Sequence, residues 1–246
     1  MHAMTSPTWP EHLMVVVIVA TGLYAIVRAH PAMKAARYDT ATKIATYWTN
    51  AAVLVVGAAA VAGAWRFAGR DLRDLGLRAG EVGPASIALT VGFLLWYVAE
   101  TWWRLSGPRR ARTIERGRRD VPFIPDTLRE YRHFAVLAAT AGVTEEIIFR
   151  GFLISYVVAL VGDSTAAVAV AIVVPALGFA IAHRYQDARS VRFIAGLATV
   201  FGLITVLTGS LLIPIVLHVV VNLTSGAIAL RVGRELGPDG RLGPVH

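Results

Sequence analysis

Residues 134–161 read FAVLAATAGVTEEIIFRGFLISYVVALV, an apolar run that carries Glu145, Glu146 and Arg150 near its middle. The run is long enough to cross a bilayer, which takes about 20 residues. A charged side chain at membrane depth costs roughly 2.5–3.5 kcal/mol on insertion scales. A chain that keeps three such side chains together is expected to use them. We therefore interpret this run both as a membrane span and as a candidate functional site.

The composition predicts the fold class. The chain has 246 residues, of which 56% are hydrophobic and 16% charged, whereas a soluble domain is about 25% charged. The apolar blocks do not alternate as the strands of a membrane barrel would. We expect an all-α, polytopic transmembrane helical bundle that forms one membrane domain over residues 1–246. Seven spans are predicted, at residues 12–28, 46–66, 84–104, 134–161, 165–183, 193–208 and 211–230.

The basic residues predict the orientation. Of the 24, 19 fall in the segments 28–45, 104–133, 184–192 and 231–246, on one side of the predicted membrane. Cytoplasmic loops are enriched in Lys and Arg, so the N-terminus is expected outside and the C-terminus in the cytoplasm. The first apolar run has no signal-peptide layout and is interpreted as a retained span. Arg outnumbers Lys 22 to two, which suggests a prokaryotic genome and a multi-pass protein of the cell (inner) membrane.

The loop 104–133 holds nine of these arginines. It is either an ordinary basic cytoplasmic loop or a surface for anionic lipid headgroups or an acidic substrate segment. Nucleic acid is not expected as a partner, because no motif or aromatic interleaving supports it. The chain has no cysteine, which excludes a thiolate metal site and a cysteine nucleophile.

Three polar motifs fall in or at the ends of predicted spans. They are Glu145-Glu146 with Arg150, then Phe179 with His183, then His218 with Asn222. In each motif the partners are four residues apart, so they share a helix face, and Glu146 is expected to face Arg150. Adjacent Glu145 points about 100° away, which follows from 3.6 residues per turn. A rise of 1.5 Å per residue places these groups in the inner half of the membrane. We expect them to converge in a cavity open to the cytoplasm.

These are the parts of a hydrolase that lacks a covalent nucleophile. A carboxylate in a partly dry pocket can act as a general base toward water, and a neutral imidazole can orient that water. A second histidine and an amide can donate hydrogen bonds to a developing oxyanion. Because Arg150 offsets the charge of Glu146, the carboxylate left for chemistry is that of Glu145.

The three motifs resemble those of the CPBP family, which comprises the type II CAAX prenyl proteases and the bacteriocin-processing and self-immunity (Abi) proteins. The family pattern is E-E-x-x-x-R, F-x-x-x-H and H-x-x-x-N/D on successive membrane helices, and the chain matches it over about residues 140–226, within a catalytic core at about 134–230. The resemblance implies an intramembrane glutamic endopeptidase that acts on a peptide or membrane-protein substrate. It makes Glu145 and His183 the water-activating pair and His218 and Asn222 the oxyanion site. Glu146, Arg150 and Phe179 would support them.

Other readings of the same residues remain open. The protein could be a non-catalytic membrane adaptor or a bacteriocin immunity protein of the same family. A proton-coupled transporter would also use intramembrane Glu and His, but no repeated half is visible. No cofactor is expected. If a zinc ion were bound, Glu145, His183 and His218 would be its ligands, although the chain has no H-E-x-x-H motif.

Overall fold

The computed structural model describes residues 6–235, with side chains as far as Arg231, and in this range it contains helices and no strand. In the N-terminal half these are α1 (Trp9–Tyr24), η1 (Ala25–Ala29), α2 (His30–Ala35), α3 (Thr40–Phe67), η2 (Leu72–Leu75), α4 (Pro84–Leu105) and α5 (Arg109–Asp120). In the C-terminal half they are α6 (Leu128–Glu146), η3 (Ile147–Leu153), α7 (Ile154–Val161), α8 (Thr165–Ala182), α9 (Ala188–Thr208) and α10 (Leu212–Glu235). The all-helical fold is therefore confirmed.

Six of the predicted spans match helices that are long and apolar enough to cross a membrane. These helices are Trp9–Ala35, Thr40–Phe67, Pro84–Leu105, Thr165–Ala182, Ala188–Thr208 and Leu212–Arg231. The predicted span at 134–161 is occupied by α6, η3 and α7, which follow one another without a break. This helical run differs from the six in the charged residues that it carries. The chain is thus a multi-pass membrane protein, with about seven helical spans.

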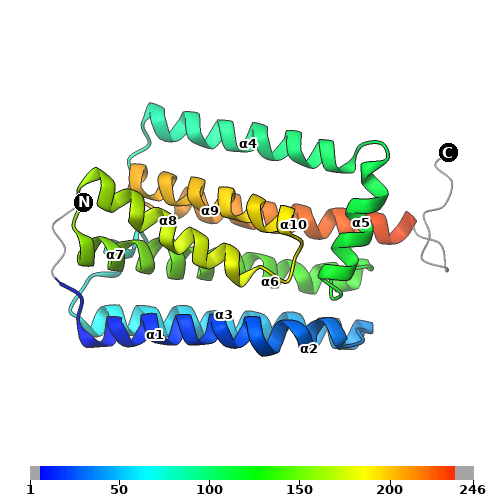
Figure 1. The fold of residues 1–246 in the computed structure, drawn as a ribbon, viewed down its shortest axis with the longest axis horizontal. Helices are drawn as coiled ribbons and strands as arrows, with labels where there is room; N and C mark the ends of the chain where they lie inside the picture. Colours follow the sequence, from blue (N-terminus) through cyan, green and yellow to red (C-terminus); the bar gives the residue numbers. More distant parts are fainter. Residues whose placement is uncertain (1–5, 236–246) are drawn as a thin grey trace.

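The long helices lie side by side, with α4 at one edge of the bundle and α1 and α3 at the other (Figure 1). At one end of the bundle lie α2, α5 and the link from α8 to α9 (Figure 1). We call this the α5 end. The predicted basic loop 104–133 contains α5, which runs across the bundle end rather than along it (Figure 1). The terminal residues 1–5 and 236–246, whose sides of the membrane were predicted, lie outside the described residues.

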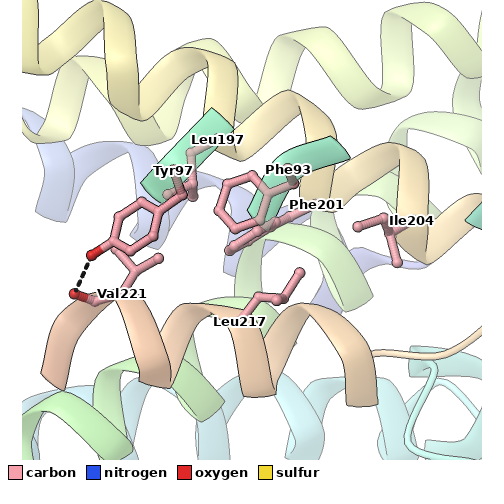
Figure 2. Packing of buried hydrophobic residues seen from close by; sticks show 7 residues of the cluster. All are labelled: Phe93, Tyr97, Leu197, Phe201, Ile204, Leu217 and Val221. Atoms are coloured by element: carbon pink, nitrogen blue, oxygen red, sulfur yellow. Dashed lines mark hydrogen bonds between the residues drawn. The ribbon is translucent and has the colours of Figure 1, made fainter. Parts of the chain in front are cut away.

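An aromatic cluster attaches α4 to the rest of the bundle. Phe93 packs against Phe201 of α9 with ring centroids 5.2 Å apart, and Leu217 and Val221 of α10 close the cluster from below (Figure 2). The hydroxyl of Tyr97 donates a hydrogen bond to the carbonyl of Val221 at 3.4 Å (Figure 2). Within a membrane, such contacts stabilise by close packing and not by exclusion of water. The cluster therefore holds α9 and α10 in register beside the polar motifs.

Glycine lets α6 and α10 approach closely. A Cβ atom on Gly142 would lie 2.5 Å from Val219 Cγ2 and 3.0 Å from the Val219 amide nitrogen. A Cβ on Gly226 would lie 2.3 Å from the ring of Phe134. Small residues at helix interfaces allow backbones to meet in this way. The contact brings the glutamates of α6 against the His218 turn of α10.

A short segment clamps the turn between α9 and α10 at the opposite end of the bundle. The turn uses Gly209 with φ of +63°, a conformation that glycine adopts without strain. Leu211 donates its amide to the carbonyl of Gly76 at 2.9 Å, and the Ser210 hydroxyl donates to the carbonyl of Arg78 at 2.6 Å. The clamp fixes where α10 begins, and so the depth of His218.

Candidate active site

The two adjacent glutamates occupy different environments. Glu146 is the last residue of α6 and is fully buried, whereas the Glu145 side chain is 18% exposed and lines a cavity of about 700 Å³. The helix continues as a π-helical turn, η3, directly after them. Such turns are rare in proteins as a whole, and those that occur are often found at functional sites. One helix thus presents one carboxylate to the protein interior and the next to open space.

Glu146 lies at the centre of a buried polar cluster. Its Oε1 accepts a hydrogen bond from Arg150 Nη1 at 2.9 Å and one from His218 Nδ1 at 2.7 Å. The guanidinium lies over the ring of Phe179, 4.7 Å from its centroid, and 5.7 Å from that of Phe201. Because a carboxylate paired with arginine only accepts hydrogen bonds, Nδ1 of His218 is the donor. The pair therefore fixes the tautomer of a neutral His218, with Nε2 as its acceptor nitrogen.

The second nitrogen of His218 faces the other glutamate. His218 Nε2 lies 3.5 Å from Oε2 of Glu145. A single imidazole thus joins the buried carboxylate to the one on the cavity wall. When His218 carries both protons, the cluster of two carboxylates, one guanidinium and one imidazolium is electrically balanced. That balance suits a buried site, since burying an uncompensated charge is costly.

His183 ends helix α8 and is oriented by it. The backbone amide of His183 donates its hydrogen bond to the carbonyl of Ala180. The carbonyl of Phe179, which would accept that amide in a continuing α-helix, therefore lacks its usual partner. The His183 ring takes that place, with Nδ1 2.8 Å from the Phe179 oxygen. A carbonyl only accepts, so Nδ1 carries the proton and Nε2 is the acceptor of the neutral ring. No hydrogen bond or ion pair joins His183 to Glu145 in the part of the chain that the structure describes, although both line the cavity.

The remaining predicted residues lie on the same cavity wall. Asn222, one turn beyond His218 on α10, directs its amide nitrogen toward the carbonyl of Ala138 at a long 3.4 Å. Phe179 contacts the rings of both histidines, with centroids 4.5 Å from His183 and 6.0 Å from His218. The structure therefore brings Glu145, His183, His218, Asn222 and Phe179 to one cavity, and it places Glu146 and Arg150 behind them.

Two aromatic residues of the site were not predicted from the sequence. Phe201 of α9 packs against both Arg150 and His218, with its ring centroid 6.1 Å from that of His218. Tyr185, two residues after His183, lines the cavity with its ring centroid 5.8 Å from that of His183. The sequence carries no signal for Phe201, whereas Tyr185 lies two residues after His183, a proximity that could have indicated it.

The zinc site considered from the sequence does not fit this arrangement. Among the described residues, no group of three His, Asp or Glu side chains is placed to hold a metal ion. Glu145 and His218 approach each other, but no hydrogen bond or ion pair among the described residues brings His183 to either of them.

The comparisons with known proteins agree with the motifs. Residues 128–224 match the family described as type II CAAX prenyl endopeptidase Rce1-like. No match was found among curated proteins or among solved structures. The matched segment runs from the start of α6 to beyond Asn222 and so contains every residue of the candidate site. The matched segment of the chain is thus similar to a CAAX-protease-type peptidase, in agreement with the resemblance of its three motifs.

Proposed function

We propose that this protein is an intramembrane glutamic endopeptidase that hydrolyses a peptide bond with a water molecule activated by Glu145. One observation carries the proposal. The imidazole of His218 lies between a buried, arginine-paired Glu146 and a cavity-facing Glu145. A purely structural ion pair needs only Glu146 and Arg150. The second carboxylate, exposed to the cavity and unpaired with arginine, is the one available for chemistry.

In the proposed reaction, water lies between the Glu145 carboxylate and Nε2 of His183. The His183 ring accepts one hydrogen bond from the water, and Glu145 removes the other proton as the oxygen attacks the peptide carbonyl carbon. The tetrahedral intermediate then collapses with cleavage of the C–N bond. Glu145 returns the proton to the leaving nitrogen, so the site ends as it began. No covalent intermediate with the protein is formed.

The developing oxyanion is proposed to lie against His218 and Asn222. In its doubly protonated form His218 keeps Nδ1–H on Glu146 and can turn Nε2–H toward the oxyanion. The amide of Asn222 makes only a long contact of 3.4 Å with Ala138, so it can exchange that contact for a better acceptor. Donors held in place in a water-poor site are worth far more than in bulk water. The buried pair of Glu146 and Arg150 holds the first of them.

The cavity is proposed to open toward the cytoplasm. Its wall continues from Glu145 to residues of the α5 end, among them Arg116 of α5 and Gln186 of the α8–α9 link. The positive-inside rule assigns this end to the cytoplasm, with the N-terminus on the other side of the cell membrane. A peptide or a membrane-protein segment would therefore reach the site from the cytoplasm or from the inner leaflet.

Cleavage of a quenched peptide by purified protein in lipid nanodiscs tests the proposal. Peptides with and without an isoprenyl group near the C-terminus serve as substrates. Glu145→Ala and His218→Ala are each expected to lose activity by a factor of about 10² or more, the scale of a general base or an oxyanion donor. His133→Ala is the matched control, because His133 contacts Trp48 away from the cavity. Wild-type rates in both site variants would contradict the assignment.

Two further measurements separate this mechanism from the alternatives. A glutamic peptidase keeps its rate after dialysis against a metal chelator, whereas a zinc peptidase loses activity and regains it with zinc. Full biological rescue by Glu145→Ala would instead favour a non-catalytic adaptor or immunity protein. Cleavage of the peptide by wild-type protein alone would exclude that role as the full explanation.

A further inference from the structure

A ring contact joins the N-terminal helical run to the lining of the active-site cavity. His30, the first residue of α2, packs edge-on against Tyr185 with ring centroids 4.7 Å apart. Tyr185 in turn lies 5.8 Å from the ring of His183. His30 lies outside the segment 128–224 that matches the peptidase family. A span with no family signal is therefore in contact with the neighbour of the water-orienting histidine.

Tyr185 separates two cavities. Together with Asn50 and Phe123 it lines the active-site cavity and also a second cavity of about 580 Å³ between α2 and α3. Phe123 is held in place by two contacts, because its carbonyl accepts a hydrogen bond from the Tyr47 hydroxyl and its ring contacts Tyr38. The Tyr185 ring has open space on two sides. Its hydroxyl makes one long contact, 3.4 Å from Gln186 Nε2.

The position of His30 against Tyr185 is unfavourable for the stability of the helix. Pro31 has no amide hydrogen, and its ring would collide with the carbonyl of Val27 in a regular α-helix. The helix accordingly widens into the π-helical turn η1 directly before His30. Nδ1 of His30 is buried without a hydrogen-bond partner among the described residues, a situation that costs about 1–3 kcal/mol. A histidine in such a position needs an explanation other than stability.

We propose that His30 is a positioning residue, which holds the ring of Tyr185 against His183 and so keeps the water-orienting imidazole in place. Without His30, the Tyr185 ring has room to swing into the second cavity. His183 would then lose the packing on that face, while its hydrogen bond to Phe179 would remain. The inference rests on the proposed function for its effect on catalysis, but the ring placement can be measured independently.

The same helix offers a matched control at its other end. His12 of α1 also pairs with a tyrosine, with its ring centroid 5.6 Å from that of Tyr156 and Nδ1 2.7 Å from the hydroxyl. That pair is distant from both cavities, since neither residue lines them. His12→Ala and His30→Ala therefore each remove an edge-on histidine–tyrosine ring contact from the same N-terminal helical run, but only the second is expected to affect the site.

The kinetic test uses full-length protein in nanodiscs with the peptide cleaved by wild type. His30→Ala is expected to lower kcat about tenfold with KM within about twofold, less than the about hundredfold loss that a 1 Å displacement can cause. His30→Phe keeps a ring against Tyr185 and should restore most of kcat. His12→Ala should match wild type. Because His30 acts through Tyr185, adding His30→Ala to Tyr185→Ala should lower kcat no further.

A second readout does not depend on activity. Protein labelled with ¹³C at the histidine Cε1 atoms gives one NMR signal per ring, and the His183 signal is assigned by its loss in His183→Gln. That signal is expected to shift in His30→Ala and to stay in place in His12→Ala. An unchanged His183 signal in His30→Ala would overturn the inference, whatever the kinetics. If the signal shifts but wild type cleaves no peptide, the proposed function fails and the positioning contact stands.

Discussion

Glu145 and Glu146 are neighbours in the sequence and opposites in the structure. Glu146 is fully buried and shared between Arg150 and His218, whereas Glu145 is partly exposed on the cavity wall and lies 3.5 Å from the far nitrogen of His218. The difference shows how one helix can carry both the support of a site and its reactive group. The inner carboxylate fixes the imidazole, and the outer one is left for water. The supporting residues and the reactive ones should therefore respond differently to substitution.

Removal of the buried cation should have the largest effect. Arg150→Leu leaves Glu146 buried without its guanidinium, and breaking a buried pair in this way costs about 3–5 kcal/mol. Arg104→Leu is the matched control, because Arg104 pairs with Glu100 at the same i,i+4 spacing but at the edge of the cavity. Arg189 also bonds Glu100, so the control should lose no more than about 1 kcal/mol. Unfolding in mixed detergent micelles measures the stability of both variants. Equal losses of stability would contradict the distinction between the buried pair and the pair at the edge of the cavity.

Loss of the proposed oxyanion donor should affect the rate and spare the fold. Asn222→Ala is expected to lower kcat by about 10²–10³, the usual effect of removing one such donor. Its melting temperature should stay close to that of wild type, since the hydrogen bond of Asn222 to Ala138 is long, at 3.4 Å. Ser225→Ala removes another polar group from the same helix and cavity wall, and its hydroxyl already donates to Val221. A similar fall in kcat for Ser225→Ala would argue against a specific role for Asn222.

The close approach of α6 and α10 should resist any larger side chain. Gly142→Val pushes against the backbone of Val219, which cannot yield as a side chain would. Overpacking of this kind costs about 1–3 kcal/mol, and it should also lower kcat by moving His218 away from Glu146. Gly63→Val on α3 meets nothing within 4 Å and serves as the control. Thermal unfolding and peptide cleavage of both variants test the expectation, which fails if Gly142→Val is tolerated as well as Gly63→Val.

The smallest effect concerns a carboxylate with a purely structural role at the α5 end. Burial raises the pKa of Glu130, but hydrogen bonds from Thr40 and the Asp126 amide, with the nearby Lys43 ammonium, outweigh it and leave the pKa below its usual range. A lowered pKa stabilises the fold above the unfolded-state value of about 4.3, and this contribution disappears as the pH falls through the folded-state value. Unfolding measured between neutral and acidic pH should show a loss that Glu130→Gln lacks. If Glu130→Gln showed the same dependence of stability on pH as wild type, the structural role of the Glu130 carboxylate would be contradicted.

Most of the fold was predictable because membrane spans are long and apolar. The expected boundaries agree with helices such as Pro84–Leu105 and Leu212–Arg231 to within a few residues. The tight link at Gly209-Ser210 was also expected, and the structure shows the positive φ of Gly209 that allows it. The clamp of residues 76–81 on that link was not foreseen. It depends on backbone hydrogen bonds between segments more than 100 residues apart, which leave no periodic signal.

The candidate site was predictable in its members and not in its contacts. Sequence spacing gives the depth of a residue in the membrane, but not the rotation of its helix relative to the others. We expected Glu145 to work beside His183, and the structure in addition places His218 within 3.5 Å of Glu145, between both glutamates. That arrangement depends on Gly142, which lets α10 approach, and on the packing of Phe201 against Arg150. Neither the close approach of α10 nor the packing of Phe201 can be derived from the motifs alone.

The most direct test of the central claim compares Glu145→Gln with Glu146→Gln in one preparation. For each variant, peptide cleavage and melting temperature are measured in the same nanodiscs. We predict that Glu145→Gln loses cleavage by a factor of about 10² or more at an unchanged melting temperature, because its role is to take a proton from water. Glu146→Gln should lower the melting temperature, because Arg150 loses its buried counter-ion. Near-wild-type cleavage by folded Glu145→Gln would contradict the account.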